Sequence, residues 1–108
     1  MPLYITFILS SDIKNELLAA EVLASLHQAI DASMDGKKAK AHKLFQHALA
    51  LDPDHADVLN EYGRFMEDED IVKADHLYKC ALLNNASHSD AVANLKRTSS
   101  IVEEIDQR

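Results

Sequence analysis

Residues 41–48 (AHKLFQHA) and residues 74–81 (ADHLYKCA) carry the same pattern of small and aromatic side chains, 33 positions apart. Alanine stands at the first and last position of each stretch, and an aromatic residue, Phe45 or Tyr78, stands at the fifth. Small residues let two helices approach closely, and an aromatic ring fills the gap between successive helical hairpins. The pattern therefore predicts tandem helical hairpins.

The spacing is close to the tetratricopeptide period of about 34 residues, in which each repeat is a pair of helices. Gly36 follows a periodic stretch and suits the left-handed conformation that ends a helix. Pro53 is predicted to begin the third helix, where its missing amide costs nothing. The residues that define the two repeats are Gly36, Ala41, Phe45, Ala48, Pro53, Tyr62, Gly63, Ala74, Tyr78 and Ala81. We expect an all-α fold of two tetratricopeptide-type hairpins in a short right-handed solenoid, with a helical bundle of chance periodicity as the alternative.

Apolar spacing and breaks divide the chain into helices. Asp12 is predicted to cap a first helix that ends near Met34. Further helices are expected over residues 38–51, 54–66, 71–83 and 89–105. The apolar segment 1–11 is expected to pack on the first helix or to fray. Residues 12–86 are expected to hold the two repeats, at about 22–53 and 56–86. Residues 87–108 are expected to form a linker or capping helix.

Composition narrows the classes of function. The 108 residues suffice for one domain, with 47% hydrophobic and 27% charged residues, as in ordinary soluble proteins. A net charge of −7 argues against binding to nucleic acid, which needs clustered cations. The apolar run at residues 2–9 falls well short of the roughly 20 residues that span a bilayer. We expect a soluble monomer without a membrane span.

A tetratricopeptide array binds proteins along the inner face of the first helix of each hairpin. The repeat register places Leu26 and Ile30 there from the first hairpin, and Asn60 and Arg64 from the second. This predicts a groove that is half apolar and half polar. Arg64 is its only cation by this register, so a basic clamp for a peptide carboxylate is not expected. Leu26 and Ile30 are alternatively core residues.

Catalytic and metal sites are not apparent from the sequence. The six histidines are scattered, and no nucleophile, base and orienting group can be assembled from the residue pattern. His76 and Cys80 share a helix face, but two ligands are too few for a structural zinc site. We therefore predict no catalytic residue and no metal site. Asn85-Ala86-Ser87 satisfies the rule for an N-glycosylation acceptor.

Several segments carry a resemblance to a known family, namely residues 43–49 (KLFQHAL), 52–54 (DPD), 74–78 (ADHLY), 81–82 (AL), 97–98 (RT) and 101–108 (IVEEIDQR). Together they resemble the animal Fic-domain protein adenylyltransferases of the endoplasmic reticulum, which carry two such repeats before their catalytic domain. The last string looks like the family's linker helix. Ala86 departs from the pattern, since it stands where a second repeat-ending proline would fall.

The resemblance implies an activity that this chain does not carry alone. The family's catalytic sequence, His-Pro-Phe-x-x-Gly-Asn-Gly-Arg, is absent from these residues, so ATP and magnesium are expected in a missing Fic domain and no cofactor here. The implied partner is the lumenal chaperone BiP, which the complete enzymes adenylylate and de-adenylylate. The implied parent protein is anchored in the membrane and faces the endoplasmic reticulum lumen. We expect a substrate-recruiting module, and a free-standing adaptor or scaffold fragment is the alternative.

Overall fold

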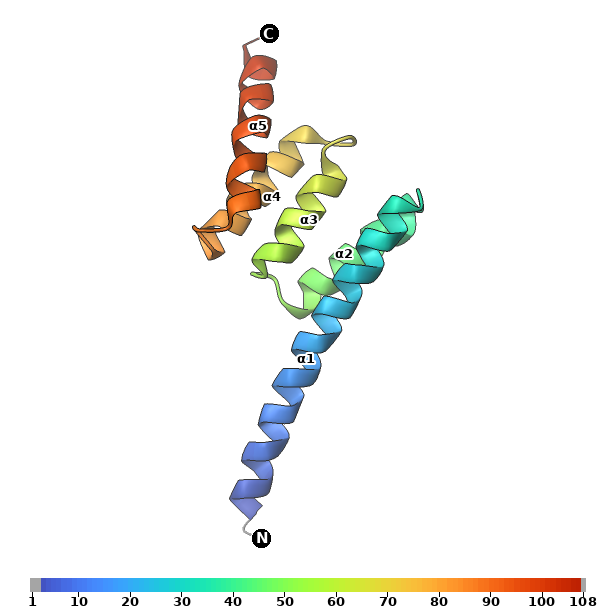
Figure 1. Ribbon diagram of the computed structural model, residues 1–108, viewed down its shortest axis with the longest axis vertical. Helices are drawn as coiled ribbons and strands as arrows, with labels where there is room; N and C mark the ends of the chain where they lie inside the picture. The colour runs from blue at the N-terminus through green and yellow to red at the C-terminus, as the bar shows by residue number, and fades with distance from the viewer. Residues whose placement is uncertain (1–2, 108) are drawn as a thin grey trace.

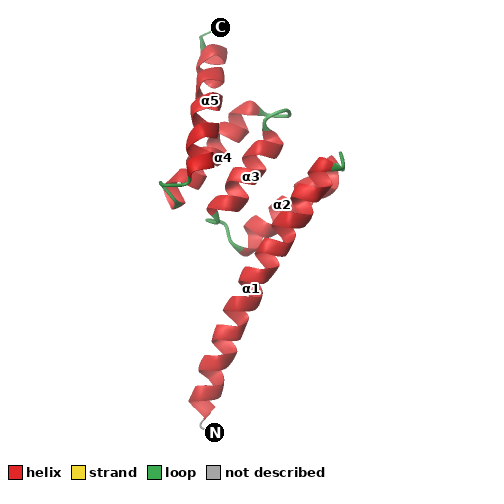
Figure 2. Cartoon of the chain, viewed as in Figure 1, coloured by secondary structure: helices red, strands yellow, loops and turns green. Residues whose placement is uncertain are grey.

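The chain folds into helices connected by short turns, as the sequence predicted. The computed structural model describes the backbone of residues 3–107 and the side chains of residues 12–107. The helices are α1 (Leu3–Met34), α2 (Lys38–Leu51), α3 (Ala56–Met66), α4 (Ile71–Asn84) and α5 (Ser89–Asp106). No strand occurs among the described residues, which confirms the all-α class (Figure 2).

The helices pair as two hairpins followed by a single helix. The C-terminal half of α1 packs on α2, α3 packs on α4, and α5 packs on α4 while also touching α3 (Figure 1). The N-terminal half of α1 extends away from these helices, and the two termini lie at opposite ends of the molecule. The arrangement is that of stacked helical repeats.

The first helix is longer at its N-terminal end than the sequence analysis predicted. It begins at Leu3 rather than at Asp12, so residues 3–11 continue the helix instead of forming a separate segment. The sequence Ser10-Ser11-Asp12 favours a helix cap, but these residues also fit a helix interior when nothing breaks the backbone. No glycine or proline occurs between residues 3 and 34 to break it. The predicted cap at Asp12 was wrong.

The turn between the hairpins corrects a second prediction. Helix α3 begins at Ala56, and His55 caps it by accepting a hydrogen bond from the Val58 backbone N–H on its Nδ1 atom. Pro53 lies in the preceding turn, which the His55 N–H closes by donating to the Asp52 carbonyl at 3.3 Å. Proline suits the second position of such a turn because its ring fixes φ. Pro53 thus ends the first hairpin rather than starting α3.

Gly36 ends α1 as predicted, and Asp70 and Gly63 also have specific structural roles. Gly36 has a φ of 75° in the turn between α1 and α2, a value that other residues reach only with strain. Asp70 ends the acidic turn before α4 and caps that helix, because its carboxylate accepts a hydrogen bond from the Lys73 N–H at 3.1 Å. Gly63 lies directly against the ring of Tyr78.

The recurring alanine and aromatic residues form the core. Each of these residues is at most 1% exposed: Ala41, Phe45, Ala48, Ala74, Tyr78 and Ala81. Between the hairpins, Phe45 of α2 stacks on Tyr62 of α3 with ring centroids 5.1 Å apart. This aromatic contact joins the two hairpins and fixes how α1 and α3 lie relative to each other.

Candidate functional site: a cavity between α1, α3 and α5

A cavity of about 650 Å³ opens on the side of the molecule where α1, α3 and α5 face one another. These are the first helices of the two hairpins and the helix that follows them. The cavity is lined by Ile30, Ser33 and Met34 of α1, Phe45 of α2, Glu61, Arg64 and Phe65 of α3, Glu67 and Asp68 of the following turn, and Asn94 and Arg97 of α5. Arg64 and Asn94 also line a smaller cavity of about 290 Å³, so the depression continues between α3 and α5.

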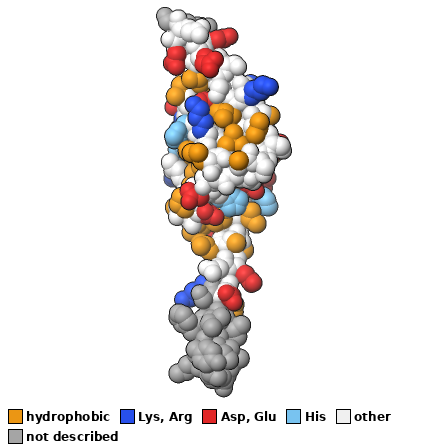
Figure 3. Space-filling view, turned by 90° about the vertical axis from the view of Figure 1, so that its left-hand side faces the viewer, with side chains coloured by type: hydrophobic (Ala, Val, Ile, Leu, Met, Phe, Trp, Pro, Cys, Tyr) orange, Lys and Arg blue, Asp and Glu red, His pale blue; other side chains and the backbone are white. Residues whose placement is uncertain are grey.

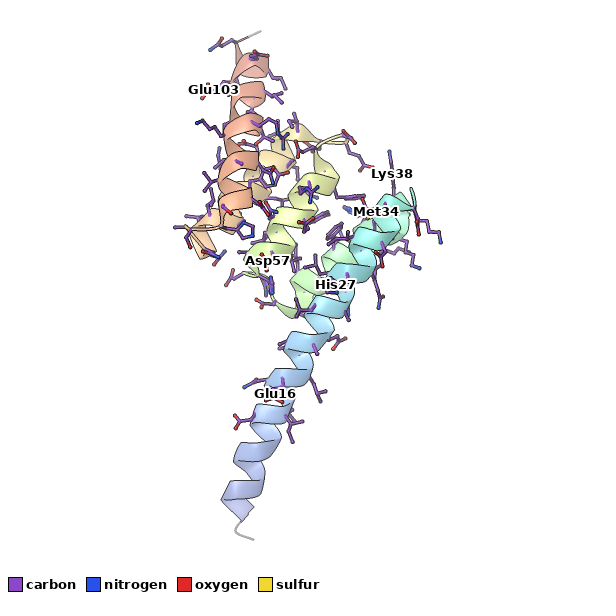
Figure 4. All side chains as sticks on the ribbon, in the orientation of Figure 1. Glu16, His27, Met34, Lys38, Asp57 and Glu103 are labelled. Atoms are coloured by element: carbon purple, nitrogen blue, oxygen red, sulfur yellow. The ribbon has the colours of Figure 1, made fainter. Side chains whose placement is uncertain are left out.

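The apolar part of the cavity comes mainly from the first hairpin. Ile30 and Phe65 are half-buried against the core, and Phe45 lies beneath them. Met34, near the end of α1, is 80% exposed (Figure 4). A methionine side chain adapts its shape to irregular apolar partners. This part of the cavity therefore offers an apolar surface that a partner side chain could cover.

The polar part is organised by an ion pair between the turn after α3 and α5. Arg97 donates from Nη1 to Glu67 Oε1, and from Nη2 to Glu67 Oε2 at 3.0 Å. The Tyr78 hydroxyl donates to the same carboxylate at 2.6 Å. Arg97 Nη2 also donates to Asn94 Oδ1 at 3.1 Å. These bonds hold the Arg97 guanidinium in one position at the edge of the cavity.

The pKa values of these groups follow from their contacts. The hydrogen bond from Arg97 holds the pKa of Glu67 below its ordinary value, with a further contribution from Tyr78 that together outweigh the effect of burial. The hydrogen bond to Glu67 raises the pKa of Arg97. Burial, followed by the hydrogen bond to Glu67, raises the pKa of Tyr78. At neutral pH, Glu67 and Arg97 are therefore both charged and Tyr78 is neutral.

Arg64 projects from α3 into both cavities and is largely exposed. Its guanidinium donates to Glu61 at 3.2 Å, one turn earlier on the same helix. An ion pair at the surface costs little to rearrange because water screens both charges. Arg64 can therefore turn towards an anionic or polar group of a partner. Arg97 is instead held by three hydrogen bonds, two to Glu67 and one to Asn94.

The structure brings only part of the predicted groove together. Ile30 and Arg64 line the cavity, but Leu26 and Asn60 do not. Leu26 is 5% exposed and belongs to the core of the first hairpin. Asn60 is 1% exposed, and its Oδ1 accepts a hydrogen bond from Asn94 Nδ2 at 3.1 Å. Neither side chain is exposed at the cavity, and Leu26 has the core position that the sequence analysis named as its alternative.

Arg97 is the site residue that the sequence analysis missed. The repeat register ends with the second hairpin, so it gave no position to a residue of α5, and Arg97 was assigned to a linker. Its spacing from Asn94 places both on one face of a helix, which could have indicated a shared surface. The cavity thus has two arginines, not one, although Glu61 and Glu67 pair with them.

The described residues show neither a metal site nor a membrane-spanning helix. Residues 12–107 contain no group of three or more histidine, cysteine, aspartate or glutamate side chains placed to hold a metal ion. His76 Nε2 and Cys80 Sγ lie 3.5 Å apart as an isolated pair. Over the same part of the chain, no helix combines the length and apolar character that crossing a membrane requires.

Comparison with known proteins relates the chain to one enzyme family. No protein-family model matches it. The proteins named protein adenylyltransferase Fic from Aedes aegypti and Culex quinquefasciatus are each 52% identical over 90 residues, covering 82% of this chain and 18% of the relative. The Nematostella vectensis protein of the same name is 44% identical over 90 residues, covering 83% and 21%. The chain thus spans about a fifth of the length of these relatives.

Solved structures agree with this relationship. Residues 134–508 of Fic-1 from C. elegans superpose with a TM-score of 0.73 at 32% identity, over 82% of this chain and 28% of that one. The second tetratricopeptide domain of Spaghetti (RPAP3), solved with the HSP90 peptide SRMEEVD, gives a TM-score of 0.72 at 15% identity, over 84% and 87%. The second likeness concerns the fold alone. Over about four fifths of its length, the chain is therefore similar to part of the Fic-type protein adenylyltransferases, and it has the fold of a tetratricopeptide domain.

Proposed function

We propose that this chain is a protein-binding repeat module that recruits or positions a protein substrate for a Fic-type adenylyltransferase. By the resemblance described above, the substrate is the chaperone BiP and the compartment is the lumen of the endoplasmic reticulum. ATP and magnesium would be handled by the catalytic Fic domain of the complete enzyme. This chain would contribute recognition, and the phosphate chemistry would take place elsewhere in the protein.

One observation carries the proposal: the cavity joins an exposed apolar surface to two arginines, of which Arg97 is held in place by Glu67 and Asn94. The Met34 side chain is open to solvent, and Arg64 is free to change partners. Interfaces of transient complexes combine a small apolar centre with a polar rim in this way. A shallow contact of this kind favours weak binding, which suits an enzyme that must release each substrate.

The fold supports the same proposal. The Spaghetti domain, which has this fold, was solved with an HSP90 peptide bound. Paired helices of this type can therefore hold a segment of a chaperone. Here the arginines are paired with acidic residues, so recognition would depend less on a peptide carboxylate and more on the apolar surface at Met34.

Direct binding with matched surface variants tests the proposal. Met34→Asp places a charge in the apolar part of the cavity, and Arg64→Glu reverses the charge in the polar part. We expect each to weaken binding of the complete chain to BiP by roughly tenfold, which corresponds to about 1.4 kcal/mol. Leu83→Asp is the control for Met34→Asp, because Leu83 is 86% exposed and does not line the cavity. Lys40→Glu, on exposed α2 surface, is the control for Arg64→Glu.

Circular dichroism of each variant establishes that the helices persist. Binding that is absent at high micromolar concentration would refute recruitment of this chaperone and favour the adaptor alternative. Equal weakening by the Leu83→Asp control would show that binding does not use the cavity.

A further inference from the structure

The turn between α4 and α5 contains a motif that protein binding does not explain. Of the five asparagines in the chain, Asn85 is the only one followed two positions later by serine or threonine. Ala86 separates it from Ser87, so the motif also lacks the proline that blocks N-linked glycosylation. A sequence match of this kind is common by chance, and its significance depends on the local structure.

Asn85 is exposed and caps the C-terminal end of α4, and its own backbone is extended. Its φ and ψ are −147° and 90°, and its backbone N–H donates the final hydrogen bond of α4 to the Ala81 carbonyl. The side-chain Oδ1 accepts hydrogen bonds from the Ser87 hydroxyl at 2.9 Å and from the Ser87 backbone N–H at 3.2 Å. The motif is thus already folded into a compact turn that presents the asparagine to solvent.

The amide nitrogen of Asn85 is available for reaction. Among the described residues, no hydrogen bond engages Asn85 Nδ2. The neighbouring Asn84 differs, because its Nδ2 donates to the Cys80 carbonyl at 2.9 Å. The two bonds from Ser87 to the amide oxygen polarise the Asn85 amide and make an Nδ2 proton easier to remove. Asn85 therefore combines exposure, a free nucleophilic atom and a polarising hydroxyl.

We propose that Asn85 accepts an N-linked oligosaccharide. The donor is an oligosaccharide linked to a lipid diphosphate, and an oligosaccharyl transferase is the catalyst. The Asn85 Nδ2 atom forms a bond to C1 of the first sugar, and the bond from C1 to the diphosphate oxygen breaks with its electron pair staying on the diphosphate. The displaced Nδ2 proton passes to a base of the transferase.

The glycan would not interfere with the candidate protein-binding site. None of residues 84–88 lines either cavity. The turn lies at the end of α4 opposite to the acidic turn that precedes that helix (Figure 1). Glycosylation and partner binding are therefore independent, and either proposal can fail without the other.

The test directs the complete chain into the secretory pathway with a cleavable signal and adds a C-terminal acceptor tag as an internal measure of delivery. The measurement is the mass of the product before and after removal of N-linked glycans by an amidase. We expect wild type to carry two glycans. Asn85→Gln and Ser87→Ala should each carry one, whereas Ser87→Thr, which keeps the hydroxyl, and Asn84→Gln should each carry two.

Each outcome decides the proposal. A wild-type chain that carries a glycan on the tag alone would refute Asn85 as an acceptor, because delivery to the transferase has then been demonstrated. Two glycans that persist in Asn85→Gln would assign the second glycan to another residue and would also overturn the proposal.

Discussion

At Gly63 the backbone of α3 meets the ring of Tyr78 on α4. A Cβ atom added at this position would lie 2.6 Å from Tyr78 Cε1 and 2.9 Å from Cδ1. Tyr78 is completely buried, so its ring has nowhere to move. Gly63→Ala should cost about 3 kcal/mol through overpacking. Better helix propensity returns about 1 kcal/mol. We therefore expect the variant to lose about 2 kcal/mol in free energy of unfolding, measured by urea denaturation.

A double-mutant cycle with Tyr78→Leu identifies the cause of that loss. Removing the ring should make most of the cost of Gly63→Ala disappear, because residues in direct contact do not contribute additively. An equal cost in both backgrounds would show that the alanine strains something other than Tyr78.

Single residues also show where reasoning from sequence reaches its limit. Periodicity placed Leu26 and Ile30 on one face of a helix, and both do face inward from α1. Leu26 is buried in the core, whereas Ile30, one helical turn later, borders the cavity. Asn60 depends on a hydrogen bond to Asn94, 34 positions away, which no local pattern indicates. Burial by a partner helix decided these roles.

Two buried or half-buried carboxylates fasten α5 to the second hairpin. Glu67 binds Arg97, and Asp75 accepts hydrogen bonds from the Thr98 and Ser99 hydroxyls at 2.8 and 2.9 Å. Burial raises the pKa of Asp75, but the hydrogen bonds from Thr98, Lys79 and Ser99 together hold it below its ordinary value. The docking of α5 thus depends on two groups that must remain ionised.

Acid should therefore loosen α5 before the first hairpin. Because both carboxyl groups have lowered pKa values in the folded chain, their contribution to stability is complete above their ordinary values of 4.5 and 3.8. It is lost as pH falls further, through the folded values. Amide hydrogen exchange from pH 6 to pH 3 should show protection in α5 falling first. Asp75→Asn and Glu67→Gln should each weaken this acid dependence.

Asp54→Asn serves as the control, because Asp54 is exposed in the turn before α3. If α5 keeps its protection at pH 3 in the wild-type chain, the two carboxylates do not hold the helix in place.

Among the elements, the interior helices were the most predictable and the first helix the least. The second helix was predicted over residues 38–51 and is found at Lys38–Leu51, because Gly36 and Pro53 mark its ends. For α1, the sequence at residues 10–12 resembles a helix cap, but the helix continues through these residues because nothing nearby breaks it. Exposed apolar residues of this helix, Ile13, Leu17 and Leu18, lie in the part that extends from the other helices.

The whole molecule follows from the repeated motif. Alanine and aromatic residues at a constant spacing build two similar hairpins, and the Phe45–Tyr62 stack joins them. The cavity follows from that stacking, because it separates α1 from α3 on one side. Arg64 on its polar edge was predicted, whereas Arg97 was not, because α5 lies outside the repeats. On the side of the molecule where α4 and α5 lie, hydrophobic and charged side chains are interspersed on the surface (Figure 3).

Competition with a complete enzyme tests whether recognition by these repeats is separable from the transfer chemistry. The complete chain is added in increasing excess to a full-length Fic-type adenylyltransferase that is modifying BiP, and the rate of adenylylation is followed. We predict that the chain transfers nothing by itself and slows the reaction in proportion to its occupancy of BiP. Met34→Asp should need roughly ten times the concentration for the same inhibition, in line with its weaker binding, and Leu83→Asp should inhibit as the unchanged chain does. An undiminished rate at high micromolar concentrations of the chain would show that these repeats do not recruit BiP.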